Sequence, residues 1–127
     1  MGKMIFCRCQ KCGNFVTFIG DKTACTPKCC GEEMKILKAN STDGANEKHV
    51  PDVKIDGDKV CVQVGSVMHP ALAEHHIVFI CLETENGCQM HYITPGDEPK
   101  ADFLLNGEKA VAVYEYCNLH GLWVKEL

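Results

Sequence analysis

The sequence lacks a long hydrophobic run, and this absence limits the class of protein first. A transmembrane helix needs a run of about 18 or more apolar residues, and none occurs among the 127 residues. The first ten residues, MGKMIFCRCQ, have no basic segment followed by an apolar stretch, so we expect no signal peptide. Phe6 stands where a myristoylation motif has Ser or Thr, which argues against that lipid anchor.

Positive charge is also not in excess. The chain has 13 Lys and Arg against 17 Asp and Glu, for a formal net charge of −4. A nucleic-acid-binding protein is expected to carry a basic patch, so nucleic acid is not expected as a partner. The sequence contains no internal repeat, and its 46% hydrophobic and 24% charged residues are typical of a soluble globular protein.

Cysteine, in contrast, is abundant. Ten cysteines in a chain without a secretion signal favour metal ligands over disulfides. Six of them lie in the first 30 residues: Cys7, Cys9, Cys12, Cys25, Cys29 and Cys30. A segment of about 35 residues buries too little core to fold alone, so we predict a small N-terminal domain that depends on a metal.

Two cysteine pairs could supply this N-terminal site. Cys9-x2-Cys12 and Cys29-Cys30 together offer four thiolates, a set that suits zinc or iron. Side chains of adjacent residues point apart, so the Cys29-Cys30 pair predicts a distorted site. A structural zinc knuckle and an iron centre remain equal alternatives at this point, and Cys7 and Cys25 are interpreted as bystanders.

The rest of the chain has an all-β pattern. The small, polar segment 39–46 is predicted to be a linker. Asp56-Gly57, Asn86-Gly87 and Asn106-Gly107 each lie between β-rich runs and predict hairpins. The predicted strands are Val53–Ile55, Lys59–Val64, His75–Glu83, Cys88–Thr94, Ala101–Leu105, Ala110–Cys117 and Leu122–Lys125. Seven short strands without a convincing helix predict an immunoglobulin-like β-sandwich.

A second group of metal-binding residue types is spread over this β-region. Cys117-x2-His120 follows a predicted strand, and His69-x5-His75 brackets a loop. With His49, these residues could form a mixed sulfur and nitrogen site, a kind of site suited to redox chemistry. Successive strand residues face opposite sides, so only one of His75 and His76 is expected to point at a metal.

The other candidates receive plainer interpretations. His91 is expected to be a solvated or hydrogen-bonded imidazole, and Trp123 a packing residue that could shield the site. Cys61, Cys81 and Cys88 are predicted to be small hydrophobic residues without a chemical role.

Several segments resemble the signature motifs of superoxide reductases. They are STDGANEKHVP at 41–51, GSVMHP at 65–70 and EYCNLHGLW at 115–123. The N-terminal Cys9-x2-Cys12-Gly13-Asn14 and Cys29-Cys30-Gly31 are similar to the desulforedoxin module. Because these motifs span nearly the whole chain in order, the sequence is identified as a member of the desulfoferrodoxin family, the two-iron class of superoxide reductase.

The resemblance implies a domain division and two non-haem irons. Residues 1–37 would form a desulforedoxin-like domain and residues 38–127 the catalytic β-sandwich. The catalytic iron would be bound by His49, His69, His75 and His120, with Cys117 as the axial thiolate. The second iron would be bound by Cys9, Cys12, Cys29 and Cys30. His76 departs from the family, which carries an aromatic residue there.

The resemblance also implies the reaction. Superoxide would be reduced by one electron to hydrogen peroxide at an open sixth position of the catalytic iron. Glu47 and Lys48 match the family's mobile loop pair above that position. A rubredoxin-type electron donor, a homodimer and a cytoplasmic location are expected on the same basis.

Formal charges agree with an anionic substrate. Four neutral imidazoles and one thiolate around Fe²⁺ leave a charge of about +1, and Lys48 adds a positive charge nearby on an otherwise acidic protein. Two other functions remain open from sequence: a rubredoxin-like electron carrier and a zinc-binding interaction module.

Overall fold

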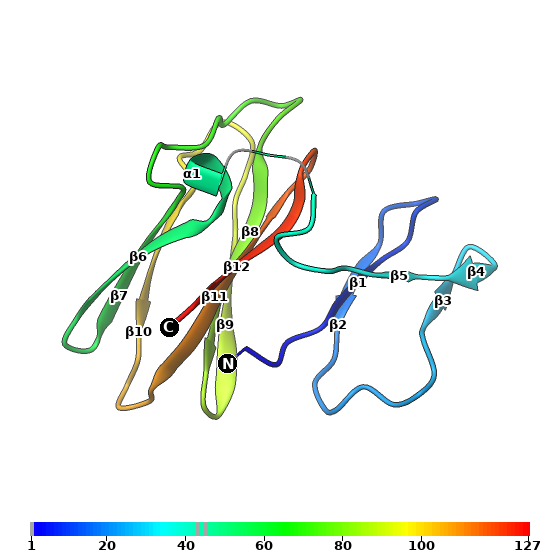
Figure 1. Cartoon of the computed structure of the whole chain (residues 1–127), viewed down its shortest axis with the longest axis horizontal. Coiled ribbons are helices and arrows are strands. Elements are labelled where there is room, and N and C mark those ends of the chain that lie inside the picture. Colours follow the sequence, from blue (N-terminus) through cyan, green and yellow to red (C-terminus); the bar gives the residue numbers. More distant parts are fainter. Residues whose placement is uncertain (1, 43, 45) are drawn as a thin grey trace. The chain divides into compact units, whose positions relative to one another are not determined.

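The computed structural model describes residues 2–42, 44 and 46–127. They form two compact units, Lys3–Lys38 and Ala39–Leu127, with Gly2 belonging to the second. The described residues contain twelve strands and one four-residue helix (Figure 1). The predicted all-β class is therefore confirmed. Asp43 and Ala45, within the predicted linker, lie outside the described residues.

The first unit consists of short strands around a very small core. Its strands are β1 (Phe6–Arg8), β2 (Phe15–Thr17), β3 (Lys28–Cys29), β4 (Glu32–Glu33) and β5 (Lys35–Ile36). They form a β2-β1-β5 sheet and a separate β3-β4 hairpin. Cys7, Cys9 and Met34 form a buried hydrophobic cluster, and Phe6 is buried as well. So small a core contributes little hydrophobic stabilisation, which agrees with a unit that needs a bound metal.

The second unit contains helix α1 (Asn46–His49) and seven strands. They are β6 (Pro51–Asp56), β7 (Lys59–Val64), β8 (Ile77–Thr84), β9 (Gly87–Tyr92), β10 (Lys100–Leu104), β11 (Ala110–Cys117) and β12 (Gly121–Glu126). Each predicted strand overlaps one of these. The strands form two antiparallel sheets, β10-β7-β6 and β12-β11-β8-β9.

The two sheets share one hydrophobic core. Alternate residues of β7, Val60, Val62 and Val64, are buried in the same cluster as Leu82 of β8 and Val113 of β11. Period-two alternation places these side chains on the inner faces. This core holds the ends of β7, β8 and β11 together, and the loops at those ends carry the candidate site.

Two of the three predicted hairpins are confirmed and one is wrong. β6 pairs with β7 across Gly57, and β8 pairs with β9 across a turn that includes Asn86. Asn106-Gly107 instead joins β10, which pairs with β7, to β11, which pairs with β8 and β12. Both residues have positive φ, 51° and 82°. The chain crosses between sheets here because Leu105 and Ala110, on either side of the turn, are both buried in the shared core.

Three irregular segments lie at one end of this unit: α1, the loop between β7 and β8, and the turn between β11 and β12 (Figure 1). The prediction that a strand begins at His75 is wrong, because β8 begins at Ile77. Strand alternation therefore does not decide between His75 and His76. None of the helical residues described forms a helix long and apolar enough to cross a membrane.

Candidate metal centres

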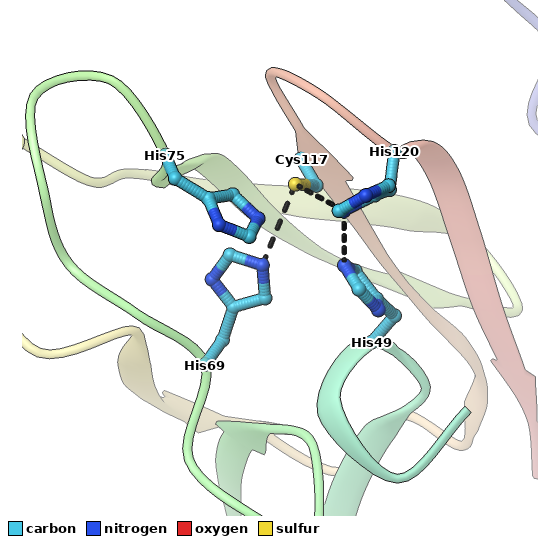
Figure 2. A group of neighbouring side chains, drawn as sticks. All are labelled: His49, His69, His75, Cys117 and His120. Carbon is cyan, nitrogen blue, oxygen red and sulfur yellow. Dashed lines mark hydrogen bonds between the residues drawn. The ribbon is translucent and has the colours of Figure 1, made fainter. Parts of the chain in front are cut away.

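Five side chains distant in sequence converge at this end of the second unit (Figure 2). His49 ends α1, His69 and His75 lie in the β7–β8 loop, Cys117 ends β11, and His120 lies in the turn before β12. One ligand atom of each lies within 4.8 Å of all the others. The structure therefore brings together every residue predicted for the mixed sulfur and nitrogen site.

The four imidazole rings are arranged as the corners of a near-square. Neighbouring ring centroids are 4.5–5.0 Å apart around the set, with interplanar angles of 71–82°. The centroids of His49 and His75 lie across the diagonal, 6.5 Å apart. The Cys117 Sγ lies 3.4 Å from His69 Nε2 and 3.8 Å from His120 Nδ1. Four nitrogens and one sulfur thus face a common point.

The chemistry of this donor set fits a transition metal. Imidazole suits iron, zinc, copper and nickel, and a thiolate strengthens binding to the softer of these ions. The His75 Nε2 is buried without a hydrogen-bond partner. An unpaired buried polar atom carries a free-energy cost, and coordination to a cation at the common point would remove it.

The close approach of the β7–β8 loop to α1, which forms the site, depends on Gly65. Val67 N donates to the Glu47 carbonyl at 2.9 Å, which binds the β7–β8 loop to α1. Gly65 has φ of +79°, and a Cβ there would lie 2.6 Å from Glu47 O and 2.5 Å from Val67 O. Only glycine fits between these backbone segments, which position His49 and His69.

We expect Gly65→Ala to disturb the site through the backbone. The added Cβ must push α1 and the loop apart, so the affinity for a bound metal should fall while the strands remain folded. Metal titration together with the far-ultraviolet circular dichroism spectrum checks both effects. Gly57→Ala, at a positive-φ glycine with open space around it, is the matched control, and equal losses of metal affinity in both variants would contradict the prediction.

The second predicted group also forms within the first unit. One ligand atom from each of Cys9, Cys12, Cys29 and Cys30 lies within 4.8 Å of the others. The Cys12 and Cys29 sulfurs are 3.5 Å apart, and those of Cys29 and Cys30 are 4.0 Å apart. Cys30 has φ of 53°, a left-handed conformation that brings the adjacent side chains to one side.

Cys7 and Cys25 are not part of this group. Cys7 is fully buried in the small core, and Cys25 is exposed. Four crowded thiols cannot all ionise without a cation: the pKa of Cys9 is lowered to about 6, chiefly by the backbone N–H of Cys12, whereas hydrogen bonds to Cys12 and Cys9 raise the pKa of Cys30 to about 12. A tetrahedral divalent ion is the partner that such a set of sulfurs fits.

The family comparison gives the decisive match. Residues 41–126 match the family model of desulfoferrodoxin. A desulfoferrodoxin from Nitratidesulfovibrio vulgaris is 42% identical over 123 residues, 94% of this chain and 93% of the relative. A desulfoferrodoxin homologue from Archaeoglobus fulgidus is 40% identical over 116 residues, 91% of each chain.

The chain belongs to the desulfoferrodoxin family.

A solved structure agrees with this assignment. The superoxide reductase from Treponema pallidum superimposes with a TM-score of 0.84 and 31% identity, covering 98% of this chain and 100% of that one. The superoxide reductase from Giardia intestinalis, described as a one-iron protein, covers 64% of this chain with a TM-score of 0.55 and 38% identity. The desulfoferrodoxin fold and its relation to superoxide reductases are thus shown in both sequence and structure.

In this chain, Trp123 supports two of the histidines. Its ring is 2% exposed and stacks on His49, with centroids 5.0 Å apart and an interplanar angle of 23°. Its Nε1 donates to the His120 carbonyl at 3.1 Å, and the Thr42 hydroxyl donates to the same oxygen. A Cβ at Gly44 would lie 3.2 Å from the Trp123 ring and 3.3 Å from His49. The sequence-based interpretation of Trp123 as a packing residue therefore missed these contacts.

Trp123 variants should separate the stacking from the hydrogen bond. Trp123→Phe keeps an aromatic ring against His49 but loses the donor to His120, and Trp123→Leu loses both. We expect metal affinity to fall in the order wild type, Phe, Leu, with a total loss on the order of 10–100-fold for a residue that orients ligands. Competition with a chelator of known affinity measures it, and equal affinities for all three proteins would show that Trp123 does not orient the ligands.

Asn118 fixes the loop that carries His75. Its Oδ1 accepts from His76 N at 2.9 Å, its Nδ2 donates to the Glu74 carbonyl at 3.0 Å, and its own N–H donates to the His76 carbonyl at 3.1 Å. The His76 ring lies 3.0–3.1 Å from the Leu72 and Ala73 carbonyls through Nδ1. His75 thus joins the group, and His76 does not, because of loop hydrogen bonds.

The electrostatics of the site favour neutral imidazoles. Burial lowers the pKa of His69 to about 4, and burial followed by the positive charges of His120 and Lys48 lowers the pKa of His75. Both rings are therefore neutral near pH 7, the form that binds a metal. Burial raises the pKa of the Cys117 thiol, although the N–H groups of His120 and Leu119 act against this. A cation would stabilise its thiolate.

Glu47 and Lys48 lie on α1 with exposed side chains, outside the group of five. The effect of the Lys48 ammonium on the His75 pKa places its charge near the site. The Glu47 backbone carbonyl accepts from Val67 N and from Ser66 Oγ, at 2.9 and 3.3 Å, so this turn is anchored while its side chains face solvent.

Proposed function

We propose that this protein is a superoxide reductase, which converts superoxide to hydrogen peroxide at an iron held by His49, His69, His75, His120 and Cys117. The observation that carries the proposal is the square of four histidines with one cysteine sulfur beside it. Relatives named superoxide reductase support it, among them proteins from Thermococcus kodakarensis and Pyrococcus abyssi, each 35% identical over 105 residues. The reaction consumes one superoxide, one electron and two protons for each hydrogen peroxide formed.

The iron, when bound, supplies the single electron and a position at which an anion can bind. The four histidines would hold it through ring nitrogens, and burial keeps the rings of His69 and His75 in the neutral form that binds a metal. With one thiolate the site keeps a formal charge of about +1. This residual positive charge favours an anionic substrate over dioxygen or water.

Cys117 has a different role from the histidines. Its sulfur comes from the buried end of β11, and the side chain is fully buried. It would bind the iron as a thiolate, a ligand that donates electron density to the metal. Such electron donation would favour release of the product.

Lys48 and Glu47 would act on the substrate side. Lys48 attracts the superoxide anion and holds a water molecule that supplies a proton to the reduced oxygen species. Glu47, on the same turn, would offer a carboxylate oxygen as a further ligand for the iron. Their exposed side chains on a turn whose backbone is anchored by Val67 and Ser66 support this division.

The first unit would carry the second iron. We propose that residues 1–37 form a desulforedoxin-like domain with Fe bound by Cys9, Cys12, Cys29 and Cys30, and that residues 38–127 form the catalytic domain. Four thiolates leave no position for a substrate, so this centre would store or transfer electrons or support the fold. A rubredoxin-type donor, a homodimer and a cytoplasmic location stay predictions.

Removing the first iron should spare the reaction. We expect Cys12→Ser to abolish the absorption of the Fe(Cys)4 centre and to leave the second-order rate with superoxide within a factor of about two, since the two centres use separate ligand sets. Stopped-flow kinetics measures the rate. Cys25→Ser, at an exposed cysteine of the same unit outside the group, is the control, and loss of the reaction with the second iron retained would contradict the independence.

Metal analysis combined with product counting tests the proposed function. The purified protein should contain two irons per chain and be coloured, and with a reductant present it should form one hydrogen peroxide per superoxide without dioxygen. Zinc alone in a colourless protein would instead indicate an interaction module. Two irons without superoxide consumption, and without a spectral change on adding azide or cyanide, would indicate an electron carrier.

A further inference from the structure

Two cysteines outside both metal groups lie side by side on β8 and β9. The register pairs Cys81 with Met90 and Glu83 with Cys88. Cys81 and Cys88 are therefore diagonal neighbours across the two strands. Residues i and i+2 of a strand share a face, so the two side chains project from the same face of the sheet. Sequence reasoning treated both as unreactive hydrophobic residues.

The tight turn nearby brings the strands close at these positions. Thr84 pairs with Gly87 around a two-residue turn. In such a hairpin the closing pair exchanges hydrogen bonds, and the next pair, Glu83 with Cys88, is of the non-hydrogen-bonded type, with Cα atoms about 4.5 Å apart. Cys81 with Met90 is again of this type. The Cys88 thiol lies near enough to Cys81 to raise the pKa of the Cys81 thiol.

The two thiols differ sharply in their access to solvent. Cys88 is exposed, whereas Cys81 is 0% exposed. Burial raises the pKa of the Cys81 thiol, and Cys88 and Glu83 act in the same direction. A dissolved oxidant can therefore reach Cys88, while Cys81 stays a protected thiol beside it.

We propose that Cys81 and Cys88 form an oxidisable thiol pair, in which hydrogen peroxide attacks Cys88 and Cys81 then closes a reversible cross-strand disulfide. In the first step the Cys88 sulfur takes one oxygen atom from hydrogen peroxide, giving a sulfenic acid and water. In the second step the Cys81 sulfur displaces that oxygen, which leaves as water with the Cys81 proton. In sum, two thiols and one hydrogen peroxide give one disulfide and two water molecules.

The position of the pair explains why the bond should be reversible. Diagonal Cα atoms are typically about 7–8 Å apart, longer than the usual disulfide span of about 4.4–6.8 Å. The strands must therefore shift on closure. β9 is the edge strand of its sheet, bonded only to β8 among the described strands, so it can move without breaking a second ladder. A strained disulfide of this kind is readily reduced.

Hydrogen peroxide can be added as a reagent. The proposed oxidation of Cys81 and Cys88 can therefore be tested independently of the proposed superoxide reductase activity. If the protein is a superoxide reductase, its own product is the oxidant. The thiol pair would then be oxidised by the peroxide that the protein forms, and a cellular dithiol would reduce the disulfide back to two thiols.

Peptide mapping of the full-length, metal-loaded protein tests the pair. Trypsin has no cleavage site between residues 60 and 100, so Cys61, Cys81 and Cys88 stay on one peptide. Cleavage after Glu74, Glu83 and Glu85 puts Cys81 and Cys88 on separate peptides. We expect these two peptides to be joined, with a mass lower by two hydrogen atoms, and to separate on reduction.

Single variants decide the roles of the two sulfurs. In Cys81→Ala, Cys88 has no resolving thiol and should gain two or three oxygen atoms. In Cys88→Ser, Cys81 should stay reduced, and Cys61→Ser should behave as wild type. Over-oxidation of Cys88 in the wild type without a joined peptide would overturn the proposal. So would joining of Cys88 to Cys61, or oxidation of Cys81 in the Cys88→Ser protein.

Discussion

Cys117→Ala should lower the rate of superoxide reduction by at least about a hundredfold. Replacing residues that merely orient metal ligands costs on the order of 10–100-fold, and Cys117 would be a ligand itself. The change removes the only sulfur that faces the four imidazoles in the five-residue group. Any absorption band from thiolate-to-iron charge transfer should disappear together with the activity.

A matched variant separates the loss of a ligand from the loss of a buried side chain. Cys81 is also fully buried, and it lies on β8 opposite Tyr114 of β11 in the same sheet as Cys117. Cys81→Ala creates a similar small cavity without touching the five-residue group. Its superoxide rate and absorption spectrum should match those of the wild type. If both variants lost activity to the same extent, the effect would come from packing.

Lys48→Ala should slow the capture of superoxide by about tenfold or more at low ionic strength, within the range by which electrostatic steering raises association rates. The ammonium is close enough to the site to lower the pKa of His75. Salt screens an exposed charge over a Debye length of about 10 Å at 0.1 M. The difference between the variant and the wild type should therefore shrink as salt is added.

The second-order rate constant, measured over a series of salt concentrations, checks this expectation. Lys54→Ala removes the same charge from an exposed position on β6, outside the group of five. It controls for the change in net charge, and its rate should stay close to that of the wild type. An unchanged rate for Lys48→Ala at low salt would exclude steering by Lys48.

Much of the fold was accessible from the sequence because hydrophobic alternation is a local signal. The runs Lys59–Val64 and Ala110–Cys117 became strands with those bounds. Turn chemistry was less reliable. Asn106-Gly107 has the positive φ angles typical of a hairpin turn, yet it joins strands of different sheets. The dipeptide determines the local turn conformation. The burial of Leu105 and Ala110 in the shared core determines that the chain continues into the other sheet.

The choice between His75 and His76 also shows that a local sequence pattern does not determine a contact between distant segments. Strand alternation predicted that only one of the two adjacent histidines points at the metal, but both residues precede β8. Asn118, more than 40 residues away in sequence, fixes this loop by three hydrogen bonds to Glu74 and His76. Such contacts leave no periodic signal in the sequence.

By itself, the sequence determined the all-β class, the two groups of ligand residue types and the resemblance to desulfoferrodoxins, because residue identity, spacing and alternation are local properties. The tertiary structure decided that five residues between His49 and His120 converge on one point. It also revealed the contacts of Gly65, Trp123 and Asn118, and the meeting of Cys81 with Cys88. These depend on how loops and strands distant in sequence pack together, and packing follows from the shared core, which no short segment specifies.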